Sequence, residues 1–388
     1  MDIIISKSKF KDAVSLARKA LSSVVIQEER GHLLFIVRGP KMIVQGTNND
    51  LKARCIIDIT NSSGEDFSFT ADPKILEKLI SKVDVDAINV QYDKETLTIR
   101  IYTTDNKKSY GTLQSFPPEK MLTFVEHLKT DRSEYPVNKE VLLFALGYAK
   151  NFLADKKDDQ KQFDFVVING GIVYAANGSN KLGLIVFKTF AAVPGLKIRK
   201  LVLPAFMNFT KGLEEKEVVL IETDKDVGVG SVDGNFYFSF LKSTIEATSI
   251  PKEHLKSMGA YTRVDKNKLL KVAERAIITN NSASMVGMEV ILSGAGEAAN
   301  IELKLVSTKA AVETISCNRV DDDSDQAISH IVDFRMLKSV LNSFTTKEEV
   351  RLHINDQNRF FKVYSKGEVD GETYVLSGVG AYAKIVSQ

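Results

Sequence analysis

The strongest constraint on the fold is a helical pattern that occurs three times, at a nearly constant spacing along the chain. Helices of this pattern are predicted at residues 72–84, 204–215 and 333–344. In the first of them apolar residues recur at i, i+3, i+4 and i+7, the spacing of a helix face that packs on a core. The equivalent apolar pairs are Leu76 with Ile80, Phe209 with Leu213, and Leu337 with Leu341.

Another helix is predicted half a period upstream of each of these. The three upstream segments are 7–21, 138–152 and 265–277, with Phe10, Val141 and Leu269 at equivalent positions. Between and after the helices the chain alternates in the manner of strands, with turn residues at the breaks. A fixed period of this kind is the signature of a repeated unit. We therefore predict an α+β fold of three repeated domains, each with two helices packed on antiparallel sheets, at residues 1–128, 129–257 and 258–388.

Two turns of similar sequence mark the ends of the first and second predicted domains. Phe116-Pro117 and Ile250-Pro251 each follow a predicted strand, and proline stops a strand from continuing. The two cysteines, Cys55 and Cys317, lie two periods apart in equivalent predicted strands. We expect them to be buried and structural. Neither a disulfide framework, nor a metal site, nor a cofactor is predicted.

The overall charge does not indicate a nucleic-acid partner, because 52 Lys and Arg residues face 50 Asp and Glu residues. A basic surface would have to arise from the placement of the charges. The chain starts without a signal-peptide core, and no stretch has the length of a membrane span. We expect a soluble, cytoplasmic protein with no membrane partner.

Lysines gather on the solvent side of the predicted helix 72–84. Lys74, Lys78 and Lys82 follow one another at i, i+4 and i+8, opposite the apolar stripe. Asp72 and Pro73 are the predicted N-cap and first turn. A solvated helix face usually mixes both signs of charge to gain i,i+4 pairs, so this column of one sign indicates a function.

A basic bias remains in all three repeats when each predicted helix turns its apolar stripe toward the sheets. Asp12, Glu77 and Glu274 also lie on these faces, but cations predominate. We interpret them as a lining that attracts DNA phosphates without reading bases. The predicted DNA-binding residues are Lys19, Lys74, Lys78, Lys82, Lys150, Lys211, Lys271, Arg275, Arg335 and Lys338.

Three similar domains joined by short linkers can form an arc with the helices on its concave face. One chain supplies six helices, and a closed ring of six, with neighbours about 8–10 Å apart, would be filled by its own side chains. Two chains supply twelve helices and a ring roughly 32–38 Å across the helix axes, whose hole accommodates a DNA duplex. A head-to-tail homodimer is therefore the smallest closure that makes a useful ring.

With these features the sequence resembles a known family, the bacterial-type DNA polymerase sliding clamps. Such a clamp is also called the β subunit or processivity factor of the polymerase. The resemblance covers the whole chain. It rests on the helix pairs, on the turns "LQSFPP" and "SIP" at the ends of the first two predicted domains, and on the segment "VDFRMLKSVLNSFTTKEEVRLHI". It implies a divergent clamp of host or viral origin: a non-catalytic homodimeric ring around duplex DNA, opened by an ATP-driven clamp loader and held by a DNA polymerase.

The resemblance also implies a partner-peptide pocket between the second and third domains, which takes a short peptide carrying Leu and an aromatic residue. The stretch "NGSNKLGL" resembles the Asp-Gly-His-Arg-Leu stretch of the family, with Lys181 in place of Arg. The family's terminal Met-Pro-Met-Arg-Leu is replaced here by "SGVGAYAKIVSQ", which leaves the peptide preference open. The implied pocket residues are Gly178, Lys181, Leu182, Pro251, Leu255, Tyr374, Val375 and Leu376.

Domains 1 and 3 are the only free ends of the arc, so we expect the dimer to join domain 1 of one chain to domain 3 of the other. The resemblance implies which residues lie near this interface. Tyr110, near the edge of domain 1, and Ile277 and Ile278, at the end of a domain 3 helix, are expected close to it. Exposed sheet edges invite the addition of a further strand.

Other functional classes fit the sequence less well. Asp321, Asp322, Asp323 and Asp325 form an acidic run in a predicted loop, but the run lacks the spacing and the glycine of an EF-hand. Glycine-containing segments at 226–234 and 293–300 are predicted hairpin turns that open no helix, so no phosphate loop is predicted. No catalytic set is found. A non-catalytic scaffold or virion structural protein built from the same repeat is the alternative, and it would bind DNA weakly or not at all.

Overall fold

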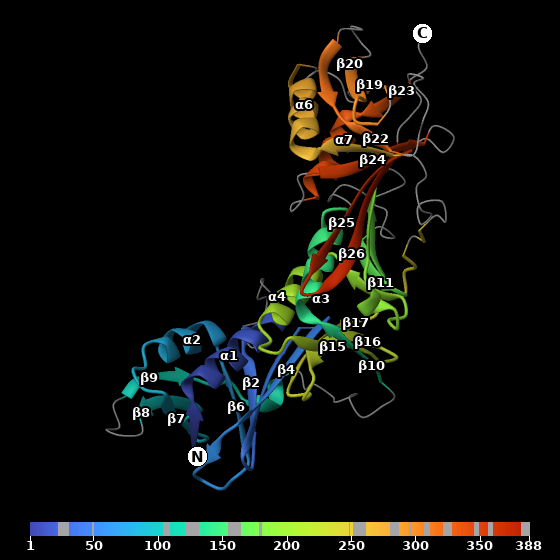
Figure 1. The fold of residues 1–388 in the computed structure, drawn as a ribbon. Helices are drawn as coiled ribbons and strands as arrows, with labels where there is room; N and C mark the ends of the chain where they lie inside the picture. The colour runs from blue at the N-terminus through green and yellow to red at the C-terminus, as the bar shows by residue number, and fades with distance from the viewer. Residues whose placement is uncertain are drawn as a thin grey trace. The chain divides into compact units, whose positions relative to one another are not determined.

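The structure is a computed structural model of the 388-residue chain. It describes residues 1–21, 31–48, 50–103, 109–121, 132–153, 164–177, 181–247, 249–250, 261–279, 287–294, 296–305, 311–320, 328–344, 349–355 and 360–381. The chain forms two compact units (Figure 1). Unit 1 comprises residues 1–143 with 201–243, and unit 2 comprises residues 144–200 with 244–388. Within the described residues, no helix is both long enough and apolar enough to cross a membrane.

The six predicted helices are all present. They are α1 (Lys7–Ala17), α2 (Pro73–Ser81), α3 (Lys139–Lys150), α4 (Leu203–Lys211), α6 (Lys266–Thr279) and α7 (Phe334–Asn342). Single turns of 3-10 helix occur at η1 (Arg18–Ala20), η3 (Pro118–Lys120) and η6 (Lys188–Phe190). The helix predicted at 7–21 is shorter than expected, because its last turn tightens into η1.

The described residues of unit 1 form two antiparallel sheets. The first has the strand order β5 (Thr60–Asn61), β1 (Asp2–Ser6), β7 (Ala87–Asp93), β8 (Thr98–Thr103), β9 (Ser109–Gln114). The second has the order β10 (Ser133–Asn138), β15 (Glu217–Glu222), β16 (Asp226–Ser231), β17 (Phe236–Leu241), β4 (Leu51–Asp58), β3 (Lys41–Thr47), β2 (Leu33–Arg38), β6 (Phe67–Ala71).

In the described part of unit 2 the strands again form two antiparallel sheets. The larger has the order β14 (Leu196–Arg199), β11 (Phe165–Asn169), β12 (Ile172–Asn177), β13 (Lys181–Val186), β26 (Glu372–Ala381), β25 (Phe360–Val369), β24 (Glu349–Asn355), β18 (Tyr261–Asp265), β22 (Asn318–Val320). The smaller has the order β21 (Ala311–Ser316), β20 (Asn300–Leu305), β19 (Gly287–Ser293), β23 (Ile328–Asp333).

The order of pairing shows a threefold repeat of strands. The series β1-β7-β8-β9 recurs as β10-β15-β16-β17 and as β18-β24-β25-β26. The series β4-β3-β2-β6 recurs as β13-β12-β11-β14 and as β21-β20-β19-β23. Each copy of the first series begins directly before an upstream helix of the repeat, so helices and strands follow the same period.

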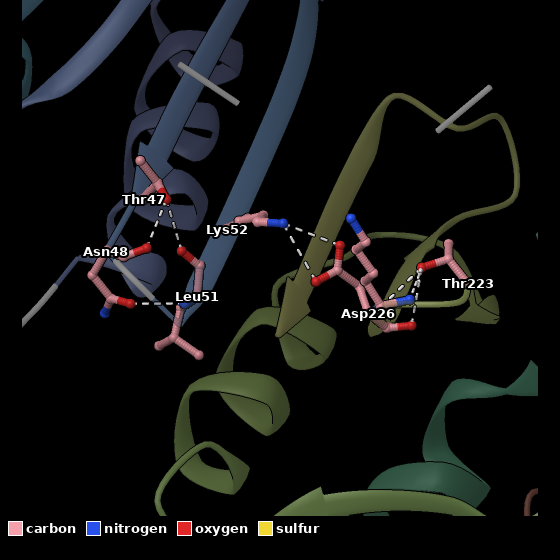
Figure 2. Close-up of polar contacts among 7 residues, drawn as sticks. Thr47, Asn48, Leu51, Lys52, Thr223 and Asp226 are labelled. Atoms are coloured by element: carbon pink, nitrogen blue, oxygen red, sulfur yellow. Dashed lines mark hydrogen bonds and ion pairs between the residues drawn. The ribbon is translucent and has the colours of Figure 1, made fainter. Parts of the chain in front are cut away.

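Two strand pairs carry a sheet from one repeat into the next. In unit 1, β17 pairs with β4, and in unit 2, β26 pairs with β13. The first of these junctions also holds an ion pair (Figure 2), in which Lys52 Nζ on β4 lies 3.1 Å from an Asp226 carboxylate oxygen on β16. Thr223 Oγ1 accepts a hydrogen bond from the backbone N–H of Asp226 at 2.9 Å. Backbone ladders therefore join neighbouring repeats at both junctions, and an ion pair adds to the first.

The sequence of α2 explains where the helix begins and which face is buried. Asp72 is the N-cap, since its carboxylate accepts hydrogen bonds from the N–H groups of Lys74 and Ile75 at 2.7 and 3.4 Å. Leu76 and Ile80 are fully buried. Gly111 on β9 lies so close to Leu79 that a Cβ there would be 2.8 Å from a Leu79 methyl group. These contacts confirm the predicted cap and apolar stripe.

The first residue of each upstream helix is a lysine, and its side chain binds the C-terminal end of the downstream helix of the same repeat. In each case Nζ donates a hydrogen bond to a backbone carbonyl just beyond the downstream helix, where carbonyls lack intrahelical partners. A cation also stabilises the negative end of the helix dipole. The three bonds are Lys7 to Val83 at 2.6 Å, Lys139 to Leu213 at 2.8 Å, and Lys266 to Phe344 at 2.6 Å.

Both cysteines are buried, as expected, and both are free thiols. Cys55 lies on β4, and Cys317 follows directly after β21, the equivalent strand. Burial raises the pKa of the Cys55 thiol well above its ordinary value. A structural role is consistent with this, because the thiolate is the reactive form.

Candidate functional site

The lysine column of α2 is exposed, as the amphipathic pattern predicts. Lys74, Lys78 and Lys82 are all exposed, opposite the buried stripe of the helix. The acidic residue among them, Glu77, pairs with Arg18 of η1. The Glu77 carboxylate is therefore drawn toward α1, and the three ammonium groups face solvent as a surface of one sign.

The other predicted DNA-binding residues lie on or directly beside helices, and they differ in exposure. In unit 1, Lys211 at the end of α4 is exposed and Lys19 in η1 is half-buried. In unit 2, the exposed residues are Lys150, Lys271 and Arg275, and the half-buried ones are Arg335 and Lys338. Their assignment to DNA stays a prediction.

One of these cations already has an anionic neighbour. Lys338 Nζ on α7 lies 3.2 Å from a Glu274 carboxylate oxygen on α6. The Arg18–Glu77 contact also links the upstream and downstream helices of one repeat, but there the acid lies on the downstream helix. Exposed pairs of this kind contribute only about 0–1 kcal/mol, so Lys338 can exchange Glu274 for a phosphate at little cost.

An acidic cavity interrupts the basic bias of unit 1. It has a volume of about 270 Å³ and lies between α1, the end of α4 and the β16–β17 turn. Asp12 and Glu214 are among its lining residues. Burial raises the pKa of Asp12, and the negative charge of Glu214 raises it further. This part of the helix surface would repel phosphates, so a basic lining would not be uniform.

An apolar cluster covers part of the larger sheet of unit 2. Leu182 on β13 lies directly opposite Val379 on β26. Three partly buried residues of the following segment, Ile245, Ala247 and Ile250, pack against the cluster. Its buried members, which we call the apolar cluster, are Phe165, Val167, Tyr174, Ala176, Leu182, Leu184, Phe360 and Val379.

The structure brings only some of the predicted pocket residues to this cluster. Leu182 belongs to it, and Val375 lies on the same face, opposite the exposed Val186. Tyr374 and Leu376 are at alternate positions of β26 and so lie on the other face. There, Tyr374 packs against Phe144, with ring centroids 4.9 Å apart. Val379 thus lies beside Leu182 in the apolar cluster, whereas Tyr374 and Leu376 lie on the other face of the sheet.

Of the remaining predicted pocket residues, Lys181 is described, and its side chain turns away from the cluster. Lys181 Nζ donates to Ser339 Oγ on α7 at 2.6 Å and to the Asn151 carbonyl at 2.9 Å, so it ties β13 to the helix side. Gly178, Pro251 and Leu255 lie outside the described residues. So does the acidic run Asp321, Asp322, Asp323 and Asp325.

The predicted interface residues lie at the ends of their elements. Tyr110 is half-buried on β9, and its hydroxyl accepts a hydrogen bond from the Asp84 N–H at 3.4 Å. Ile277 is half-buried near the end of α6, and the side chain of Ile278 is 72% exposed. Single exposed apolar side chains are common on protein surfaces, so the contact of Ile278 with another chain stays a prediction.

The whole-chain architecture matches solved structures of DNA polymerase III β subunits and sliding clamps. The DNA polymerase III β subunit of Pseudomonas aeruginosa superposes with a TM-score of 0.73 at 15% identity, covering 97% of this chain and 99% of that one. The β subunit of Thermotoga maritima superposes with a TM-score of 0.70 at 10% identity, covering 98% and 99%. The sliding clamp of Caulobacter crescentus gives a TM-score of 0.70 at 12% identity, covering 97% and 99%. The chain has the sliding-clamp fold. Sequence comparison alone finds no matching family model and no similar curated protein.

Residues that hold this clamp fold together escaped prediction although the sequence carries a signal for some of them. Lys7, Lys139 and Lys266 recur at the first position of the three upstream helices, a period visible in the sequence. Their role needed the structure, because a surface lysine and a carbonyl-binding lysine look alike in sequence. Arg18 and Val379 had no comparable signal.

Proposed function

We propose that this chain is a DNA sliding clamp, a processivity factor for DNA replication that encircles duplex DNA and tethers a polymerase. The observation that supports it most is the repeated strand order. Two junctions between repeats are formed within the chain, and the strands for a third junction lie at sheet edges. β17 pairs with β4, and β26 pairs with β13. The equivalent strands of the first and third repeats are β9 and β21, and among the described strands each is paired on one side only.

A second copy of the chain completes the series. If β9 of one copy pairs with β21 of the other, the junction reproduces the two internal ones. A two-fold axis then generates a second identical junction and closes the assembly. Tyr110 on β9, and Ile277 and Ile278 on α6, are the residues we assign to this interface. The apolar surface of Ile278 would be covered there.

The basic helices supply the DNA contact in this proposal. Contacts between ammonium groups and phosphates are independent of base sequence, and their strength depends on salt through counterion release. A sliding ring requires this kind of weak, sequence-blind contact. The lysine column of α2 is its clearest part, because all three side chains are exposed and the one carboxylate among them is paired with Arg18.

The remaining features of the proposal follow from the same function. A clamp loader would open the ring, and a DNA polymerase would bind the apolar cluster through a peptide carrying Leu and an aromatic residue. We assign no catalytic step and no cofactor to the chain. We place it in the cytoplasm, where replication of a bacterial or phage-type genome occurs.

Retention on DNA tests encirclement. Loaded protein should remain on closed circular DNA far longer than on linear DNA, from which a ring slides off. The Lys74→Glu, Lys78→Glu, Lys82→Glu triple variant should fold normally, since such surface changes cost within about 0.5 kcal/mol each. It should nevertheless lose loading and processive synthesis, because six reversed charges would meet one duplex.

A matched triple variant provides the control. Lys41, Lys94 and Lys120 are exposed residues away from the helices α1, α2 and α4, and their change to Glu alters the net charge equally. The control should load normally. Equal retention on circular and linear DNA would argue against a ring. Wild-type processivity of the α2 variant over a range of salt would remove α2 from the DNA contact.

Solution mass tests the dimer. The Ile277→Lys, Ile278→Lys variant should be a folded monomer, because two ammonium groups would have to be buried at the interface. Leu201→Lys is the control, since Leu201 is 88% exposed and belongs to no predicted interface. A double variant that stays dimeric at low micromolar concentration would show that the interface lies elsewhere.

A further inference from the structure

The larger sheet of unit 2 has one face toward its helices and one face away from them. A Cβ at Gly183 or Gly378 would collide with or crowd the ring of Phe152, so these glycines lie on the helix side. Successive residues of a strand point to opposite faces. Leu182 and Val379 therefore lie on the second face, which we call the outer face.

Cross-strand register arranges the side chains of the outer face in two rows. The first row is Ala176, Leu182, Val379, Lys362 and His353. The second row is Tyr174, Leu184, Ser377, Tyr364, Arg351 and Arg263. Both rows begin with apolar residues on β12 and β13 and end with basic residues on β24 or β18. The apolar cluster thus continues, on one sheet face, through the buried Lys362, Ser377 and Tyr364 to a basic surface formed by the partly exposed His353, Arg351 and Arg263.

Two arginines of this surface are held by tyrosine rings. The Arg351 guanidinium lies 4.7 Å from the centre of the Tyr261 ring and 5.5 Å from that of Tyr364. The two rings are 5.6 Å apart in an edge-to-face arrangement. Arg263 lies 6.0 Å from the Tyr261 ring and donates to its hydroxyl at 3.4 Å. Stacked guanidinium groups are pre-organised, so they lose little side-chain entropy when they bind a ligand.

The charges of this surface favour an anionic ligand. Arg263 and Arg351 lie directly opposite each other on neighbouring strands, where like charges are destabilising. Glu349 on β24 acts electrostatically on Arg263. Asp265, at the end of β18, is engaged as the acceptor of the Lys268 N–H. A carboxylate ligand would offset the repulsion between the arginines, since guanidinium groups bind carboxylates through paired, charge-assisted hydrogen bonds.

We propose that this outer face binds an acidic segment flanking the apolar anchor of the partner's peptide. The inference rests on the proposed function, because the anchor occupies the apolar cluster around Leu182. Three strand steps of about 4.8 Å separate β13 from β24, a distance of roughly 14 Å, and an extended peptide advances about 3.3 Å per residue. The partner's acidic residues therefore lie about four or five positions from its Leu or aromatic anchor.

Synthetic peptides test the inference by fluorescence anisotropy. The probe is a labelled Leu-Ser-Leu-Phe anchor, either alone or joined to three Asp residues through a Gly-Ser spacer of one, four or eight residues, at either end. The four-residue spacer should bind about tenfold more tightly than the same peptide with a serine tail, as two ion pairs on a protein surface can supply. A lysine tail should bind more weakly than the serine tail.

Protein variants locate the effect. The Arg263→Gln, Arg351→Gln double variant should lose the gain from the acidic tail and keep the affinity for the bare anchor. Arg199→Gln is the matched control, because Arg199 is exposed at the other end of the same sheet, opposite Phe165. It should leave the gain unchanged. The comparison of acidic, serine and lysine tails uses the unchanged protein, so it tests the inference even if the double variant folds poorly.

The outcomes separate this inference from the proposed function. Binding of the bare anchor with no advantage for the acidic tail, or an advantage that survives in the double variant, overturns the inference and leaves the anchor pocket standing. Acidic peptides that bind through the arginines while the bare anchor does not bind would support the basic surface and refute the pocket. Arginine-dependent binding of single-stranded oligo(dT) in place of the acidic tail would make the surface a nucleic-acid site and overturn the proposal.

Discussion

Replacing Lys266 with methionine removes one hydrogen bond and leaves the packing of the side chain largely intact. Lys266 is 9% exposed, and Nζ donates to the Phe344 carbonyl at 2.6 Å, directly after α7. Methionine retains an apolar stem of similar length but offers no donor. The variant therefore leaves a buried carbonyl without this donor, at the end of a helix whose dipole the ammonium group stabilises.

The expected loss of stability can be worked out from these contacts. A hydrogen bond from a charged group contributes about 1.5–3 kcal/mol, and a cation at a helix end a further 0.3–1 kcal/mol or so. Methionine recovers part of this, because an ammonium group no longer has to be desolvated. We expect a net loss of about 2 kcal/mol for Lys266→Met. Lys7→Met and Lys139→Met should cost less, about 1 kcal/mol each, since both side chains are only half-buried.

Urea denaturation, with hydrogen exchange resolved by peptide, measures the effect. A chain of two compact units need not unfold in one step, so the exchange data should show that the loss falls on α6 and α7. Lys268→Met is the control, because Lys268 is exposed on the same helix. If Lys266→Met and Lys268→Met lose the same stability, the hydrogen bond from Lys266 to the Phe344 carbonyl does not stabilise the repeat. The same conclusion follows if Lys266→Met loses less than about 0.5 kcal/mol, the range of ordinary surface changes.

Three further changes test other contacts. Gly183→Ala should cost about 1–3 kcal/mol by overpacking against Phe152, and adding Phe152→Ala should give a total loss smaller than the sum of the two single losses in urea denaturation. Asp226→Ala should cost about 2 kcal/mol because it leaves Lys52 without this carboxylate, and replacing both residues with apolar ones should cost less than that. Cys55 should resist iodoacetamide at pH 8 in the native protein and react fully in guanidinium, because burial raises the pKa of its thiol. Mass spectrometry of a variant with Cys317 changed to serine measures the alkylation, and rapid reaction of the native protein would contradict this.

The helices were predictable because each carries a one-sided apolar stripe with a clear period. Asp72, Pro73 and the buried Leu76 were identified from local sequence alone, and the structure confirms all three. The threefold order followed from comparing such stripes along the chain. Local periodicity was sufficient here because one face of α2 is buried and the other is exposed.

The outward-facing residues of β26 were less predictable, because β26 lacks that contrast. From Leu376 onward its described side chains are buried on both faces, so no alternation shows which residues face outward. A shift of one residue moves every side chain to the opposite face. The resemblance placed Tyr374 and Leu376 at the pocket, whereas the register with β13 places Val379 beside Leu182. Which strand neighbours β13 is a long-range fact that no local pattern contains.

The strand ladders across the repeat junctions determine where this chain could be divided. A fragment that ended after the first repeat would keep β4 and lose β17, which would leave a row of unpaired N–H and C=O groups on a largely buried strand. A fragment that began with the third repeat would expose β26 in the same way, since β13 would be missing. An isolated repeat would thus carry open strand edges that are paired in the intact chain. Exchange of single repeats between such proteins, in nature or in the laboratory, requires each incoming repeat to fit the strand edges on both sides of it.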